Sequence, residues 1–192
     1  MSIHTIISLA TTFACIGILV VIPVFLVSYF VIYRKLLKGK RRLTFGQVLW
    51  TCIFLCYGFI VLSATIFMRF PSWWTGEFYP LFYSYREAWI TGSAASWRNI
   101  FLNYLMFVPI GFLLPVGMRH FEKCGWTVLF AFCFSLTIEV IQYVSKRGMF
   151  ELDDLLGNTL GALIGFGLYR LALNTFSGLK RRQQKRQFTI VS

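Results

Sequence analysis

The chain has 192 residues, of which 57% are hydrophobic and 14% are charged, and its mean hydropathy is +0.67. A soluble domain of this length buries only part of its surface, so this composition excludes an ordinary soluble globular domain. The net charge of +12 would indicate a nucleic-acid partner in a soluble chain, but here the charges are sorted between loops. The composition predicts an all-α protein, a polytopic transmembrane helical bundle in the cell membrane.

Five apolar segments are about as long as an α-helix that crosses a bilayer, which takes roughly 20 residues. In chain order they are residues 6–32, 43–68, 99–118, 126–144 and 155–173. The first three contain no Asp, Glu, Lys or Arg. The fourth contains Glu139 and Gln142, and the fifth contains Arg170 near its end, where a long side chain reaches the interface. We expect about five helices, the first of them retained because its apolar run is too long for the core of a cleavable signal.

Basic residues are concentrated on one side of these five segments. Fourteen lie in the first loop, the third loop and the C-terminal end, against five in the other two connections. The positive-inside rule therefore predicts an external N-terminus and a cytoplasmic C-terminus. Four parts result: two helices with a basic cytoplasmic loop (1–68), an extracytoplasmic aromatic loop (69–98), a three-helix core (99–175) and a basic cytoplasmic tail (176–192). We expect this tail to contact anionic lipid at the inner leaflet, with no nucleic-acid partner.

The connection from Arg69 to Arg98 contains ten aromatic residues. Trp and Tyr favour the headgroup zone, so this segment is expected to lie on the outer face of the bilayer. Two interpretations stay open. The loop is either a simple interfacial belt or a lid over a site, with residues 92–96 as its hinge.

Polar residues inside a bilayer are costly, so their positions are informative. Three expected helix ends bring such residues to one level near the outer leaflet. The set is Arg98, Asn99, Asn103, Glu139, Gln142, Arg147, Asp153, Asp154 and Asn158. Spacings of three or four residues place the members from each helix on one face, which predicts an outward-facing polar pocket.

Structural roles are open for several members of this set. Asp153 or Asp154 suits the N-cap of the last helix, and the three asparagines suit hydrogen bonds between helices. Glu139 is expected to be protonated or paired, with Arg98 or Arg147 as its partner. Those two arginines also suit a pyrophosphate or a carboxylate, although the nearby acids would repel it.

Small residues recur every four positions along the last helix, at Gly157, Gly161 and Gly165. This spacing is typical of close helix packing and carries no chemistry of its own. The five cysteines lie in or at the edge of apolar segments without a Cys-x-x-Cys pair, so we expect packing roles, no disulfide framework and no metal site.

Three ordered blocks, at residues 99–115, 135–142 and 147–165, resemble the VanZ-like family of bacterial membrane proteins. The resembling residues include Asn99, Asn103 and Pro109 in the first block, Glu139 and Gln142 in the second, and Arg147, Gly148, Asp153, Asp154 and Asn158 in the third. The resemblance implies low-level tolerance of glycopeptide antibiotics, chiefly teicoplanin, in a Gram-positive type of cell envelope.

Three modes of action are open. The favoured one is a membrane factor, with no catalysis and no cofactor, that acts on lipid-linked cell-wall precursors or on a lipoglycopeptide antibiotic among the membrane lipids. The second is an intramembrane enzyme that modifies a lipid phosphate, using Glu139, Asp153 and Asp154 as a base or as ligands of a divalent cation. The third is a carrier of lipid or protons, against which stand the apolar cytoplasmic halves of the helices.

Overall fold

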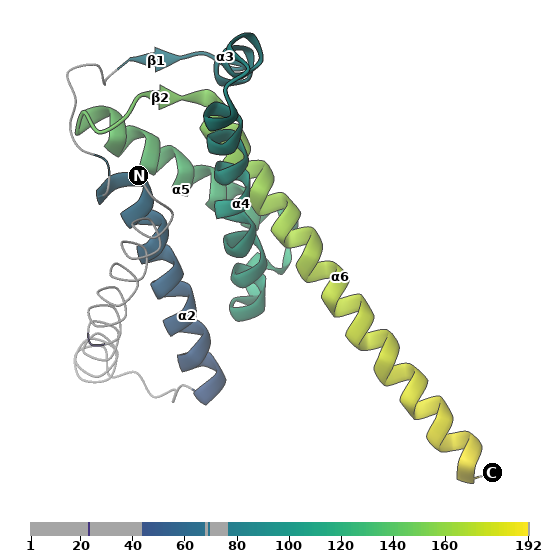
Figure 1. The fold of residues 1–192 in the computed structure, drawn as a ribbon. Coiled ribbons are helices and arrows are strands. Elements are labelled where there is room, and N and C mark those ends of the chain that lie inside the picture. The colour runs from purple at the N-terminus through teal and green to yellow at the C-terminus, as the bar shows by residue number, and fades with distance from the viewer. Residues whose placement is uncertain (1–22, 24–43, 68, 70–76, 192) are drawn as a thin grey trace, which may run out of the picture. The chain divides into compact units, whose positions relative to one another are not determined.

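The computed structural model describes residues 23, 44–67, 69 and 77–191, with side chains for all of these except residues 67 and 178–191 (Figure 1). Its elements are α2 (Phe45–Leu62), the π-helical turn η2 (Ser63–Phe67), β1 (Phe78–Tyr79), α3 (Tyr83–Thr91), α4 (Ala94–Gly117), the 3-10 helix η3 (Arg119–Glu122), α5 (Cys124–Val144), β2 (Phe150–Glu151) and α6 (Leu152–Val191). The predicted all-α helical fold is confirmed, and two short paired strands are its only sheet in this part of the chain.

Four helices of the described part are long and apolar enough to cross a membrane. They span Phe45–Ile66, Ala94–Gly117, Cys124–Val144 and Leu152–Ser177. These correspond to the second to fifth segments expected from the sequence. The expected first helix, residues 6–32, lies outside the described residues apart from Pro23.

Local sequence explains where several of these helices begin. Thr44 and Gln47 form a capping box at the start of α2, in which each side chain accepts a hydrogen bond from the other residue's backbone N–H. The Ser93 side chain caps α4 by accepting a hydrogen bond from the backbone N–H of Ser96. Helix α4 therefore begins at Ala94, five residues before the expected start.

The segment expected to be a flexible hinge, residues 92–96, is mostly ordered helix. Gly92 ends α3 in the left-handed conformation, with φ 61°, and Ala94 already belongs to α4. The aromatic connection also contains the whole of α3, on which Trp89 is 80% exposed. The hinge interpretation is wrong for Ala94 to Ser96, whereas the interfacial position of this connection stays a prediction.

The chain divides into two compact units. Unit 1 comprises Met1–Phe78 and Ile138–Phe150, and unit 2 comprises Tyr79–Thr137 and Glu151–Ser192. In unit 1, the strand pairing brings the Phe150 N–H to the Glu77 carbonyl at 2.9 Å and stacks the rings of Phe78 and Phe150.

Unit 2 is built around the contact between α4 and α6, which lie side by side (Figure 1). A Cβ atom added at Gly161 would lie 2.1 Å from the Tyr104 carbonyl oxygen, and one at Gly165 would lie 2.0 Å from that of Val108. Gly111 on α4 meets the Ala162 backbone in the same way, at 1.9 Å. Only glycine permits so close an approach of two helix backbones, which explains the four-residue glycine spacing of α6.

Candidate functional site

Asp153 stabilises the start of α3. One carboxylate oxygen accepts the backbone N–H of Phe82 at 2.5 Å, and the other accepts that of Ser84 at 2.8 Å. Helix α3 has no cap from its own N-cap residue, Phe82, which adopts a left-handed φ of 68°. Asp153 supplies the missing acceptors and places negative charge at the positive end of that helix. The Ser84 hydroxyl adds a hydrogen bond to Glu151 at 2.8 Å.

This arrangement corrects the N-cap expectation for the last helix. Helix α6 begins at Leu152, so Asp153 and Asp154 both lie in its first turn rather than at its N-cap. Asp153 caps a different helix, which precedes it by about 70 residues in the chain. Asp154 instead accepts a short hydrogen bond from the Asn103 amide of α4.

Two tyrosines lie beside these aspartates. The hydroxyl groups of Tyr85 on α3 and Tyr104 on α4 are 2.7 Å apart. Burial raises the pKa of Tyr85, and its hydrogen bond to Tyr104 and the charges of Asp153 and Asp154 raise it further. Tyr85 is therefore a neutral phenol at physiological pH. We refer to Ser84, Tyr85, Asn103, Tyr104, Glu151, Asp153 and Asp154 as the aspartate cluster.

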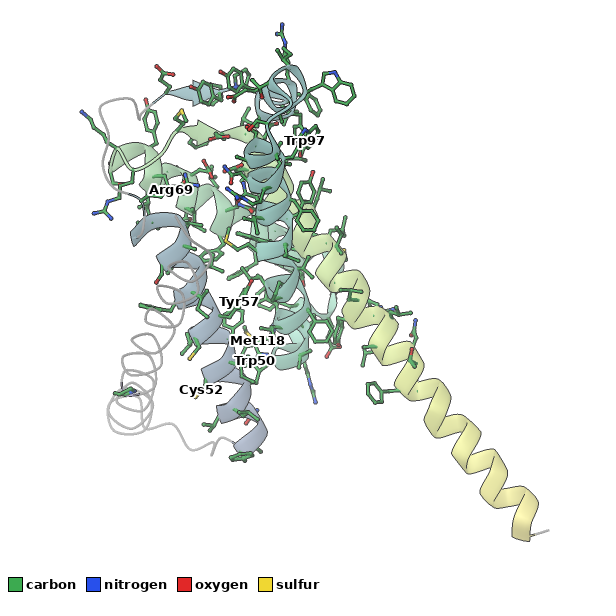
Figure 2. All side chains as sticks on the ribbon, viewed as in Figure 1. Trp50, Cys52, Tyr57, Arg69, Trp97 and Met118 are labelled. Carbon is green, nitrogen blue, oxygen red and sulfur yellow. The ribbon has the colours of Figure 1, made fainter. Side chains whose placement is uncertain are left out.

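One turn along α6, Asn158 links two helices of unit 2. Its Nδ2 donates to the Ser135 hydroxyl of α5 at 2.8 Å, and the residue is only 2% exposed. Its Oδ1 has no hydrogen-bond partner among the described residues. Arg98 and Asn99, by contrast, are exposed on the first turns of α4, where Figure 2 labels the neighbouring Trp97.

A second group of polar residues lies in unit 1, at the end of α2. The Gln142 side chain donates to the Thr65 carbonyl at 2.8 Å, and Arg147 Nη1 donates to the Ile66 carbonyl at 3.1 Å. Carbonyl groups in the last turn of a helix lack partners within the helix, so these two side chains satisfy them. Both acceptors lie in the π-helical turn η2, an irregularity that is frequent at functional sites.

The Arg69 guanidinium also lies near Gln142 and Gly148. A Cβ atom built on Gly148 would lie 3.0 Å from Arg69 Nη1 and 3.5 Å from Gln142 Cδ, so the guanidinium and the amide flank one point. Figure 2 labels Arg69 in this region. We refer to Thr65, Ile66, Arg69, Gln142, Arg147 and Gly148 as the arginine cluster.

Glu139 is also in unit 1, one helical turn before Gln142. It is 2% exposed and it has an interaction partner in the structure. The pairing with Arg98 or Arg147 stays a prediction. Because Glu139, Gln142 and Arg147 belong to unit 1 and the other six members of the expected pocket belong to unit 2, a single pocket formed by all nine also stays a prediction.

Sequence reasoning missed several members of the two clusters. Ser84, Tyr85, Tyr104 and Thr65 lie in segments whose sequence is generically aromatic or apolar, and so does Ser135, the partner of Asn158 outside the two clusters. Arg69 was expected only to be a charge of the aromatic loop. Among the described residues, no group of three or more His, Cys, Asp or Glu side chains is arranged to hold a metal ion.

These features define a helical membrane protein with four long apolar helices, of which α5 and α6 carry buried carboxylates and amides. The chain belongs to the VanZ/LLP1 family, whose model matches residues 54–173. It is 34% identical over 82 residues to Protein VanZ of Enterococcus faecium. That match covers 42% of this chain and 49% of the relative, so it spans about half the length of the curated protein. No solved structure matches the chain.

Proposed function

We propose that the protein confers low-level tolerance of glycopeptide antibiotics, in particular teicoplanin, by acting at the outer leaflet of the cell membrane. The observation that carries this proposal is the 34% identity to Protein VanZ, together with the family match over residues 54–173. The candidate ligands are the antibiotic itself and lipid-linked cell-wall precursors. Both are found at the membrane surface, the level at which the polar ends of the helices are expected.

The hydrogen bonds of the aspartate cluster favour a binding protein over an enzyme. Both carboxylate oxygens of Asp153 accept backbone N–H groups, and Asp154 accepts from Asn103, so these acids are held in structural contacts. A general base needs an oxygen within reach of the proton that it removes. A carboxylate that accepts two backbone N–H groups has its position fixed, which suits a structural role.

The proposal is tested by expressing the protein in a susceptible Gram-positive host that lacks a relative. We expect the minimal inhibitory concentration of teicoplanin to rise more than that of vancomycin, compared with an empty vector. An epitope tag would verify that the protein reaches the membrane. Unchanged teicoplanin susceptibility at normal abundance would contradict the proposal.

Lipid extraction from the same two strains separates the binding mode from the enzymatic one. A binding protein leaves the chemical identity of lipid phosphates unchanged, whereas an enzyme produces a new species or depletes an existing one. Appearance of a modified lipid phosphate, lost in a Glu139→Gln variant of normal abundance, would establish the enzymatic alternative instead.

A further inference from the structure

The arginine cluster of unit 1 has the composition of an anion site. Two guanidinium groups, those of Arg69 and Arg147, approach one short stretch formed by the end of η2 and the loop after α5. A guanidinium carries five N–H donors in a planar fork, and Arg147 donates one Nη1–H to the Ile66 carbonyl. Both side chains are half-buried, so an anion bound there would be partly withdrawn from water, where charge-assisted hydrogen bonds are strongest.

Gly148 permits this approach. A Cβ atom at this position would lie 3.0 Å from Arg69 Nη1 and 3.2 Å from Gln142 Cβ, closer than side-chain carbons normally pack. A Cβ atom at this position would require the Arg69 guanidinium and the Gln142 side chain to shift by a few tenths of an ångström. Gly148 therefore allows both side chains to lie against the same point of the backbone.

The buried side chain of Gln142 is a second, independent indication of a bound ligand. The residue is 2% exposed, and its Nε2 is oriented by the Thr65 carbonyl, which only the amide N–H₂ can satisfy. Its Oε1 must then face elsewhere, and this oxygen has no hydrogen-bond partner among the described residues. A buried acceptor without a donor is unfavourable, and a ligand that brings a donor group would satisfy it.

The depth of the cluster in the membrane indicates where its ligand comes from. The apolar spans of α2 and α5 end at Ile66 and Val144, so Arg69 and Arg147 each follow a span by three residues. Three residues of chain reach about 10 Å at most, so both guanidinium groups stay within reach of the headgroup layer next to the hydrocarbon core. Lipid phosphate is the anion concentrated in that layer.

We propose that Arg69 and Arg147 bind the phosphate of an anionic membrane lipid, and that Gln142 Oε1 accepts a hydrogen bond from a hydroxyl of the same headgroup. A phosphoglycerol headgroup has both parts, a phosphate and neighbouring hydroxyls. This inference deepens the proposed function, from which it takes only the placement of these helix ends at the membrane surface. It gives the site a resident lipid whose binding is measurable without any antibiotic.

The test uses the full-length protein purified in detergent, with phosphatidylglycerol, phosphatidylcholine and inorganic phosphate as separate probes. Native mass spectrometry reports bound lipid, and thermal unfolding reports stabilisation. We expect phosphatidylglycerol to bind at least about tenfold more tightly than phosphatidylcholine. Both lipids carry a phosphate, but the quaternary ammonium of phosphatidylcholine would be repelled by the two guanidinium groups, and its headgroup has no hydroxyl for Gln142. Equal stabilisation by inorganic phosphate would show that the ligand is free phosphate, and equal binding of the two lipids would overturn the site altogether.

Matched variants locate the site. Arg69→Gln should abolish the preference for phosphatidylglycerol, and Gly148→Ala should weaken it, whereas Arg86→Gln, which changes an exposed guanidinium on α3, should leave it intact. Arg69→Gln is the decisive variant, since Arg147→Gln also removes a hydrogen bond to the backbone of η2. A preference that survives Arg69→Gln would refute the assignment.

A comparison of two anionic lipids tests the role of Gln142. Phosphatidylmethanol carries the same charge as phosphatidylglycerol and no headgroup hydroxyl, so it should bind more weakly to the wild type. The two lipids should become equivalent in a Gln142→Leu variant that stays folded. Equal binding of the two lipids to the wild type would show that Gln142 does not recognise a headgroup hydroxyl.

Teicoplanin tolerance without a preference for phosphatidylglycerol would refute this inference alone. A preference for phosphatidylglycerol without teicoplanin tolerance would refute the proposed function alone.

Discussion

Replacing Gly161 by alanine should force α4 and α6 apart. The new Cβ atom would lie 2.1 Å from the Tyr104 carbonyl oxygen and 2.9 Å from its carbon. Even a close contact between carbon and a carbonyl oxygen is about 3.3–3.6 Å long, so the helices must separate by about 1 Å at this point. Overpacking of this kind typically costs about 1–3 kcal/mol, and here the colliding atom is backbone that no rotamer change can move away.

The assay is thermal unfolding of the purified protein in detergent, together with its abundance in the membrane. Gly167→Ala is the matched control, because it adds the same methyl group to the same helix at a place with nothing within 4 Å. We expect Gly161→Ala to unfold at a clearly lower temperature and Gly167→Ala to unfold at or slightly above the wild-type temperature. Equal unfolding temperatures for Gly161→Ala and the wild type would refute the close contact between α4 and α6.

Three further predictions address the aspartate cluster and the topology. Asp153→Asn leaves one acceptor oxygen for two backbone N–H groups at the start of α3, so it should lower the stability to thermal unfolding by about 1–3 kcal/mol. A variant as stable as the wild type would show that Asp153 does not cap α3. Tyr85→Phe removes the hydroxyl that bonds to its partner on α4 and should cost about 1 kcal/mol in the same assay, whereas no loss would argue against that bond. In a variant without the native cysteines, a cysteine that replaces Gly76 should react with an impermeant thiol reagent in intact cells, and one that replaces Gly39 should not. The reverse labelling pattern would show that the predicted membrane orientation is inverted.

Apolar length alone was enough to predict the four described spans. Helix α2 and helix α5 begin within two residues of the expected positions, because a run of uncharged residues of that length has few alternatives. The expected start of α4 lay five residues too late because Arg98 ended the uncharged run from which that segment was predicted. A local reading of Ser93 as an N-cap would have placed the start correctly, since its side chain satisfies the Ser96 N–H.

Local sequence patterns could not predict the partners of the acidic residues. Asp153 resembles an N-cap because it lies at the start of a helix, but it caps α3, which precedes it by about 70 residues. No periodicity connects residues so far apart, and only the folded chain shows which helix ends meet. The same holds for Arg69, whose guanidinium and the Gln142 side chain both lie against Gly148. Short-range patterns predicted which residues are unusual, whereas the contacts that explain them are long-range.

We propose that the protein protects against a membrane-anchored antibiotic at the outer leaflet. Teicoplanin carries an acyl chain that anchors it in the membrane, so a protein acting in that layer should obstruct it more than a drug that diffuses freely. The most direct measurement compares the inhibitory concentrations of teicoplanin and of its deacylated core in one expressing strain and its vector control. We predict a clear rise for teicoplanin that shrinks when the acyl chain is removed. Equal protection against both compounds would contradict action at the membrane surface, and no protection against either would contradict the proposed function.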